Sequence, residues 1–227
     1  MRPRLLDLFC GAGGAGMGYH RAGFEVVGVD ILPQPHYPFE FHQADALTVA
    51  LDGFDAIHAS PPCQSFSTLR FFQADPSRFN EADCLPPIRE RLRSHSAPHV
   101  IENVPSSPGP WDLRLCGTMF GLRVKRHRYF AANWPMSPFG PCSCRHGRTS
   151  AGLRLLDMTS SKAFHRNTTE RTYVNEMGVT WAPLENRGSA YKNGRQKLAQ
   201  QAIPPAYTEW IGRQLMAHLQ TLRSSVA

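Results

Sequence analysis

The sequence predicts an α/β protein built on a doubly wound parallel sheet, and three observations predict it. Short apolar runs alternate with helix-like stretches along the first 130 residues, as in parallel sheets whose faces are covered by helices. The first run, Leu5 to Phe9, ends in a cluster of glycines that opens a helix-like stretch closed by Gly23. Helical periodicity returns after an irregular segment, from about Ala199 onward. With 227 residues, the chain suits one domain with a modest insertion.

Each later element follows from a local pattern. Strands are expected at Phe24 to Val29, Phe54 to Ser60, His99 to Val104 and Arg128 to Trp134, and a helix is expected over residues 88 to 95. A final helix is expected to begin near Pro204-Pro205, because proline is favoured in the first turn of a helix. Its apolar residues recur at helical spacing, so one face of this helix should pack on the body; they are Ile211, Leu215, Leu219 and Leu222.

Residues 131–197 differ from the rest of the chain in composition and charge. Between about 135 and 193 the sequence is rich in Ser, Thr, Gly, Asn and Arg and shows no sustained period. Residues 131–199 hold ten Lys or Arg against four acidic residues, and so carry six of the seven net positive charges. This distribution fits either a surface that binds a polyanion or a solvated loop region. We expect a body of residues 1–130, an inserted segment of residues 131–197, and residues 198–227 that complete the body.

The composition indicates an intracellular protein. No stretch approaches the roughly 20 apolar residues that a membrane-spanning helix requires, and no apolar signal region precedes the first strand. A chain of this size does not need its six cysteines as disulfides, so a reducing, cytoplasmic compartment is expected. We expect a soluble monomer with no membrane association and no obligate protein partner.

The glycine cluster has two interpretations. Asp30 lies 19 residues beyond Gly11, at the end of the second strand, where an acidic side chain can accept hydrogen bonds from ribose hydroxyls. A tight turn from strand to helix can also need glycines for packing alone. The third strand favours the nucleotide site, because it ends in Ser60-Pro61-Pro62-Cys63-Gln64, a rigid turn that presents a thiol beside that site.

Four motifs resemble those of the cytosine-5 DNA methyltransferases, in the order of that family, and small bacteriophage-encoded members are the most similar in style. The motifs are Asp7-Leu-Phe-Cys-Gly-Ala-Gly-Gly14, Ser60-Pro-Pro-Cys-Gln-Ser65, Glu102-Asn-Val104 and Arg126-His-Arg128. The resemblance covers about residues 4 to 130 and, more loosely, the stretch from Gln196. It implies a class I S-adenosylmethionine-dependent methyltransferase of Rossmann-like fold with a small target-recognition insertion. The implied reaction methylates carbon 5 of cytosine in double-stranded DNA, on a base flipped out of the helix, and leaves S-adenosyl-L-homocysteine.

The resemblance assigns Cys63, Glu102, Arg126 and Arg128 to the chemistry. Carbon 5 of cytosine is a poor nucleophile, and the thiolate of Cys63 would activate it by adding to carbon 6. Glu102 would hold a proton at ring nitrogen 3, which requires burial to raise its pKa. Arg126 and Arg128 alternate in strand register and would contact the flipped base and its phosphate. In the alternative interpretation Cys63 is a buried apolar residue, Glu102 a capping acid, and the arginines part of an exposed basic strand.

The same resemblance implies the binding residues. For S-adenosylmethionine, Phe9 would lie near the adenine, Asp30 at the ribose, Asp45 at the exocyclic amine and Pro62 at the methyl end; the other cofactor residues would be Asp7, Gly11, Ala12, Gly13, Gly14, Ile31, Ala46 and Gln201. On the substrate side they would be Gln64, Ser65, Asn103, Arg145 and Arg148, with Asn103 orienting the Pro-Pro-Cys loop. Asp45 has an alternative role, because acids after a strand commonly cap helices.

Three positions depart from the usual family sequence. Val124 stands where Gln precedes the paired arginines, and Gln200-Gln201 precede Ala-Ile-Pro-Pro where Gly-Asn is usual. These departures leave open the transfer of a group other than methyl and a catalytically weakened enzyme. The competing functions are an RNA methyltransferase that acts on transfer RNA and a non-catalytic DNA-binding relative. The sequence does not indicate the target site or whether a restriction enzyme accompanies the protein.

Cys142, Cys144 and His146 form a short Cys-x-Cys-x-His motif that His165 could complete as a zinc site. The spacing is tighter than that of the usual ligand pairs, and methyl transfer from a sulfonium needs no Lewis acid. No metal is therefore expected. Cys116 lies in apolar company and is expected in the core.

Overall fold

The computed structural model describes residues 1–62, 83–144, 155–157, 170–181 and 202–225. A seven-stranded sheet forms the centre, in the order β3-β2-β1-β4-β5-β8-β6. Its strands are β1 (Arg4–Leu8), β2 (Glu25–Asp30), β3 (Glu40–Gln43), β4 (Ala56–Ala59), β5 (His99–Asn103), β6 (Leu113–Leu115) and β8 (Arg128–Ala132). Strands β1 to β5 run parallel to one another, and β8 lies between β5 and β6, antiparallel to both. The doubly wound sheet is confirmed, with one antiparallel strand, β8, that the strand pattern did not indicate.

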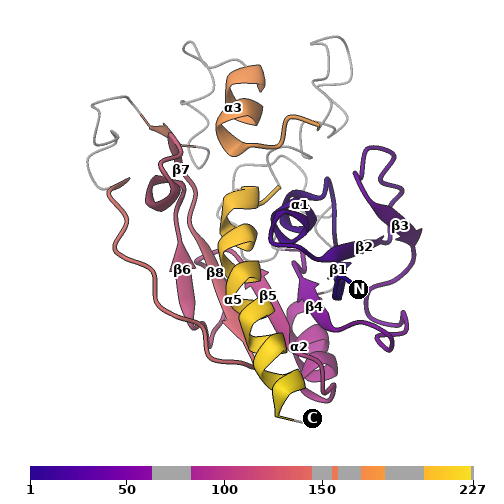
Figure 1. Ribbon diagram of the computed structural model, residues 1–227. Coiled ribbons are helices and arrows are strands. Elements are labelled where there is room, and N and C mark those ends of the chain that lie inside the picture. The colour runs from indigo at the N-terminus through magenta and orange to yellow at the C-terminus, as the bar shows by residue number, and fades with distance from the viewer. Residues whose placement is uncertain (63–82, 145–154, 158–169, 182–201, 226–227) are drawn as a thin grey trace.

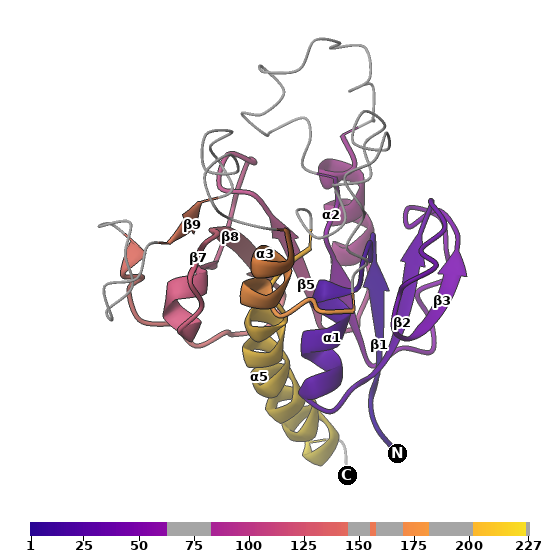
Figure 2. The same ribbon diagram turned by 90° about the horizontal axis from the view of Figure 1, so that it is seen from above.

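Helices cover both faces of the sheet (Figures 1 and 2). Successive residues of a strand point to opposite faces, so Leu5 and Leu6 of β1 enter two different apolar cores. The core of Leu5 includes residues of α1 (Gly14–Arg21) and α5 (Pro205–Ser224), and the core of Leu6 includes residues of α2 (Leu85–Arg93). The result is a three-layer α/β arrangement.

Glycines in α1 let α5 pack closely against it. A Cβ atom on Gly18 would lie 2.0 Å from Oγ1 of Thr208, and one on Gly14 would lie 2.3 Å from the carbonyl oxygen of Ile203. The hydroxyl of Thr208 also donates a hydrogen bond of 2.8 Å to the carbonyl oxygen of Ala15. A larger residue at Gly18 would therefore push the two helices apart, and one at Gly14 would push away the segment that leads into α5.

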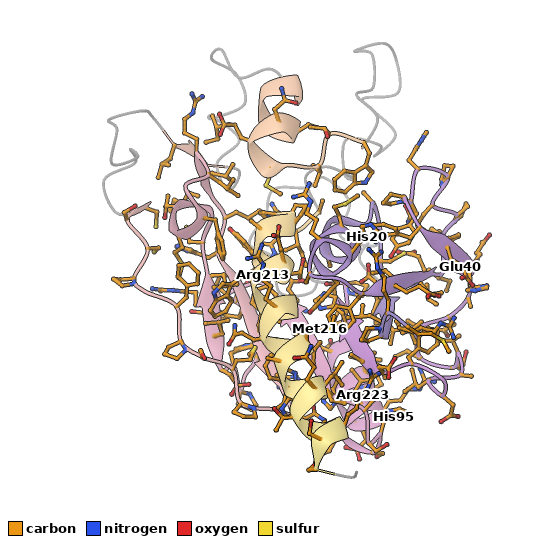
Figure 3. The ribbon with its side chains drawn as sticks, viewed as in Figure 1. His20, Glu40, His95, Arg213, Met216 and Arg223 are labelled. Atoms are coloured by element: carbon orange, nitrogen blue, oxygen red, sulfur yellow. The ribbon has the colours of Figure 1, made fainter. Side chains whose placement is uncertain are left out.

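The final helix matches the prediction at three of its four apolar positions. Ile211, Leu215 and Leu219 are buried, whereas Leu222 is 42% exposed, so the packed face ends before the helix does. Near that end Arg223 lies with its Nη2 atom 2.8 Å from Oδ1 of Asp55, in the loop before β4 (Figure 3). Neither α5 nor any other described helix has the length and apolar character needed to cross a membrane.

The described parts of residues 131–197 pack on the body. Strand β9 (Leu156–Asp157) pairs with β7 (Val124–Lys125), and α3 (Glu170–Met177) places Val174 in an apolar cluster with Val124. Val124 is fully buried there, and the amide of a glutamine would lack polar partners in such a cluster. This packing accounts for the departure at residue 124. The boundaries at 131 and 197 stay predictions.

Candidate active site

The carboxyl ends of β1, β4 and β5 lie at one edge of the sheet, where the antiparallel β8 begins. The order of strands along the chain reverses between β1 and β4, and in open α/β sheets ligands bind outside the carboxyl ends at such a point. The glycine loop follows β1, Ser60-Pro61-Pro62 follows β4, Glu102 lies at the end of β5, and Arg128 begins β8. The sheet therefore brings all four quoted motifs to one edge.

Glu102 is buried beside two arginines. Its side chain has Oε1 at 2.8 Å from Nε of Arg128, close enough for an ion pair, although the angle is outside that of an aligned hydrogen bond. Burial raises the pKa of Glu102 above its ordinary value, against the opposing effects of Arg128, Arg126 and a hydrogen bond with Ser60. Glu102 can therefore keep a proton at a higher pH than an exposed glutamate does.

Arg126 and Arg128 approach Glu102, but the predicted strand register is wrong. Arg126 lies between β7 and β8, outside either strand, and is 6% exposed. The hydroxyl of Tyr207 donates a hydrogen bond of 2.6 Å to its carbonyl oxygen. Nη1 of Arg128 donates one of 2.9 Å to the carbonyl oxygen of His127. Backbone contacts in a turn, and not strand alternation, place the two positive charges near one carboxyl group.

Asn103 holds the loop that leads to Cys63. Its Nδ2 donates a hydrogen bond of 3.2 Å to the carbonyl oxygen of Pro61, one residue before Pro62. Because Asn103 ends β5 next to Glu102, the same strand end carries the acid and steadies the loop. Six predicted site residues lie outside the described residues: Cys63, Gln64, Ser65, Arg145, Arg148 and Gln201.

A chain of buried polar groups leads from α1 to Glu102. The hydroxyl of Tyr19 lies 3.1 Å from Nδ1 of His58, and Nε2 of His58 lies 2.8 Å from Oγ of Ser60, which in turn bonds to Glu102. Burial lowers the pKa of His58 to about 3, so its imidazole is neutral, with one donor and one acceptor nitrogen. The chain can therefore donate toward an ionised Glu102 or accept from a protonated one.

The geometry of the glycine loop is compatible with ligand binding and also with a need for glycines in packing. Gly11 and Gly13 have positive φ angles of 48° and 81°, which glycine adopts without strain. A Cβ atom on Gly11 would meet nothing within 4 Å, whereas one on Gly13 would meet Tyr37 and one on Gly14 would meet Ile203. Gly11 leaves room for a ligand beside the backbone, and the glycines after it are needed for packing.

The ends of β1 and β2 form the surface next to Gly11. Oδ2 of Asp30 accepts a hydrogen bond of 3.0 Å from the amide of Gly11, which joins the two strand ends. Ile31 and Leu32 follow and are 65% and 64% exposed. Phe9 has a φ of 57°, a backbone conformation that non-glycine residues adopt mainly at functional or strained positions. An apolar surface beside a carboxylate is suited to a ligand that carries both a base and a ribose.

Other predicted cofactor residues have structural roles. Asp7 is fully buried and accepts a hydrogen bond of 3.0 Å from the hydroxyl of Tyr37. Tyr37 packs beside the glycine loop, so Asp7 would act on a ligand indirectly. Oδ1 of Asp45 accepts a hydrogen bond of 2.8 Å from the amide of Leu47, as in an Asx turn, and no helix of the described chain begins there. Ala12 and Ala46 are buried.

The structure places further residues around the candidate active site that no sequence motif indicated. Nε1 of Trp181 donates a hydrogen bond of 2.8 Å to the carbonyl oxygen of Ala12, 169 positions earlier. Part of the segment expected to recognise the target thus also supports the glycine loop. His58 and Tyr207 are buried polar residues whose partners are set by the fold.

The strand order, the antiparallel β8 and the polar site at the point of reversal define the fold of class I methyltransferases. Three solved structures share it: the Dnmt2 methyltransferase of S. pombe (TM-score 0.62, 15% identity), a DNMT2 variant of Spodoptera frugiperda (0.61, 13%) and the methyltransferase EhMeth of Entamoeba histolytica (0.60, 12%). Each match covers 96% of this chain and 99% of the other. The likeness confirms the predicted fold. No protein-family model and no curated protein matches the sequence.

Proposed function

We propose that the protein is an S-adenosylmethionine-dependent DNA (cytosine-5) methyltransferase. The observation that carries the proposal is Glu102, a buried carboxyl whose pKa is raised at the edge of the sheet where the Pro-Pro-Cys loop begins. A protonated carboxyl can serve ring nitrogen 3 of a cytosine placed there. The four motifs and the methyltransferase fold support the same conclusion.

The residues at the ends of β1 and β2 fit S-adenosylmethionine. Gly11 leaves open space beside its backbone, and the Asp30 carboxylate retains lone pairs for ribose hydroxyls after binding two amides. Exposed Ile31 offers an apolar contact for the adenine. When bound, the cofactor supplies an electrophilic methyl group.

The chain would supply the rest of the chemistry. The Cys63 thiolate forms a bond to carbon 6, and the π pair of the carbon 5–carbon 6 double bond shifts to carbon 4–carbon 5. The π pair of the carbon 4–nitrogen 3 bond moves onto nitrogen 3, which Glu102 protonates. Carbon 5 then accepts the methyl group, and nitrogen 3 returns its proton to Glu102. A base removes the carbon 5 proton, the double bond re-forms and the sulfur leaves as thiolate. Arg126 and Arg128 orient Glu102 and the flipped cytosine.

Double-stranded DNA is the proposed substrate because of the charge of residues 131–199, which carry six of the seven net positive charges. An enzyme that extrudes a base must hold the duplex while the base leaves the stack. Phosphate contacts from residues such as Arg145 and Arg148 would supply that hold, and a few contacts with base edges would set the target sequence.

Labelled cofactor, duplex DNA and transfer RNA test the proposal directly. Label should enter DNA, and conversion sequencing of plasmid from expressing cells should locate the methylated cytosine. DNA with 5-fluorocytosine at that site should trap a covalent complex, because fluorine cannot leave as a proton does. Cys63→Ala should abolish the complex and the matched control Cys84→Ala should keep it.

Each contrary result has its own meaning. An undiminished adduct in Cys63→Ala would refute the assignment of the nucleophile. Label in transfer RNA alone would establish an RNA methyltransferase. Cofactor binding without label in either nucleic acid would establish a non-catalytic relative.

A further inference from the structure

Three cysteines and one histidine meet beside the arginine pair. Cys116 precedes the 3-10 helix η4 (Gly117–Phe120), His127 lies between β7 and β8, and Cys142 and Cys144 follow β8. The Sγ atoms of Cys142 and Cys144 are 3.4 Å apart and lie 3.6 and 3.3 Å from Nε2 of His127. All four potential ligand atoms, including Sγ of Cys116, lie within 4.8 Å of one another.

These distances fit the corners of one tetrahedral zinc site. In a tetrahedral site, zinc bonds of about 2.3 Å to sulfur and about 2.0 Å to nitrogen place two sulfurs about 3.8 Å apart and a sulfur and a nitrogen about 3.5 Å apart. The three separations among Cys142, Cys144 and His127 differ from these values by a few tenths of an ångström. The Sγ atom of Cys116 lies within 4.8 Å of the other three atoms, so a shift of about 1 Å or less would bring it to the fourth corner. Three thiolates with one imidazole are a common ligand set of structural zinc sites. We propose that Cys116, His127, Cys142 and Cys144 bind one zinc ion.

The surroundings favour a closed site. Cys116 and Cys144 are buried and Cys142 is partly buried, in a cluster with Leu155. The hydroxyl of Thr118 lies 3.5 Å from Sγ of Cys116 and can donate to it, a contact that steadies a thiolate ligand. The chain fills all four positions and leaves none for a substrate, so the ion stabilises the fold and takes no part in methyl transfer.

The sequence does not indicate this site because its four ligands are widely spaced along the chain. The order is Cys-x10-His-x14-Cys-x-Cys, in which Cys142 and Cys144 belong to the motif considered above and Cys116 and His127 do not. The two other histidines of that motif lie outside the described residues. Cys116 is buried, as expected, and its neighbours make it a potential zinc ligand as well as a core residue.

The ion would fix the link between β7 and β8, which holds Arg126 and leads into Arg128. It ties the turn between β7 and β8 to η4 on one side and to the start of the inserted segment on the other. His127 is therefore a positioning residue for Arg126 and Arg128. That consequence rests on the proposed function, whereas zinc binding itself does not.

Metal analysis of the dialysed protein tests the site. Mass spectrometry should find about one zinc per chain. Cys116→Ser and Cys144→Ser should each lose it, and the matched control Cys84→Ser, a thiol outside the cluster, should keep it. Protein loaded with cobalt should show the intense sulfur-to-metal absorption of a tetrahedral thiolate site. His127→Cys should retain the ion and shift this absorption, because a sulfur replaces the nitrogen.

Zinc far below one per chain, or zinc retained in both serine variants, would overturn the proposal. Should those variants fail to fold, the cobalt spectrum of the unaltered protein decides, since a spectrum without the sulfur band also overturns it. The metal readout needs no methylation. A zinc-loaded protein that transfers no methyl group would refute the proposed function and leave the site standing.

Discussion

The hydroxyl of Tyr207 on α5 donates a buried hydrogen bond of 2.6 Å to the carbonyl oxygen of Arg126. The ring of Tyr207 stacks on Phe120 with centroids 5.1 Å apart, so apolar packing places the ring and the hydroxyl reaches the turn before β8. The last helix thereby supports a residue of the candidate active site from the side of the apolar core.

Tyr207→Phe should lower the stability of the protein by about 1–3 kcal/mol, because it leaves a buried carbonyl without its donor. Urea unfolding measures the loss. Tyr129→Phe is the matched control, since the Tyr129 hydroxyl makes no hydrogen bond among the described residues, and it should change stability by less than about 0.5 kcal/mol. Equal stability of the two variants would show that another donor satisfies Arg126.

Glu102→Gln should slow single-turnover methylation by about two orders of magnitude or more, as the loss of a general acid does. Glutamine keeps the size of the side chain but cannot exchange a proton with nitrogen 3. Cofactor affinity, measured by calorimetry, should be unchanged. A normal rate at saturating cofactor together with weak cofactor binding would instead make Glu102 a cofactor residue.

The contribution of Asp7 to the free energy of unfolding should fall as pH rises. Burial raises the pKa of Asp7 to about 8 from 3.8, despite hydrogen bonds from Tyr37 and the backbone of Gly16. Between these pH values the folded state holds a proton that the unfolded state has released. The contribution of Asp7 to stability is therefore full below about pH 4 and is lost at about 1.4 kcal/mol per pH unit up to about pH 8.

Asp7→Asn removes this titration and keeps an oxygen for Tyr37. The stability of the variant relative to the unaltered protein should rise from pH 4 to pH 8 and then level off. Urea unfolding at several pH values measures it, and the titration of His58 cancels in the difference. A difference that stays constant over this range would mean that Asp7 is ionised in the folded protein.

Trp181→Phe should weaken S-adenosylmethionine binding by about 2- to 10-fold, the equivalent of one neutral hydrogen bond. The variant frees the carbonyl oxygen of Ala12 in the glycine loop. Trp134→Phe is the control, because the buried indole nitrogen of Trp134 has no hydrogen-bond partner in the described part of the chain. The same affinity in both variants would show that the loop keeps its shape without Trp181.

Local patterns in the sequence predicted much of the fold. The run from Leu5 to Phe9 became β1, and Ile211, Leu215 and Leu219 marked the packed face of α5. Motif resemblance selected Glu102, Asn103 and Arg128, and the structure brings them to one edge of the sheet because strand ends converge in this architecture. Their roles in catalysis stay predictions.

What the sequence missed depends on contacts between distant residues. Strand β6 has three residues and gains its place by pairing with β8, which no local period reveals. Trp181 meets Ala12 across 169 positions, and Cys116 meets Cys144 through the turn at His127. The strand register of Arg126 failed because a turn interrupts the alternation between β7 and β8.

The close contact of α1 with α5 also sets a condition on how the protein is made. Thr208 contacts Ala15 across 193 positions of the chain. A ribosome that adds about 5–20 residues per second needs roughly 10–40 s to synthesise the chain from α1 to the part of α5 that packs on it. During that time the first βα unit carries an uncovered apolar face, the kind of surface that chaperones hold.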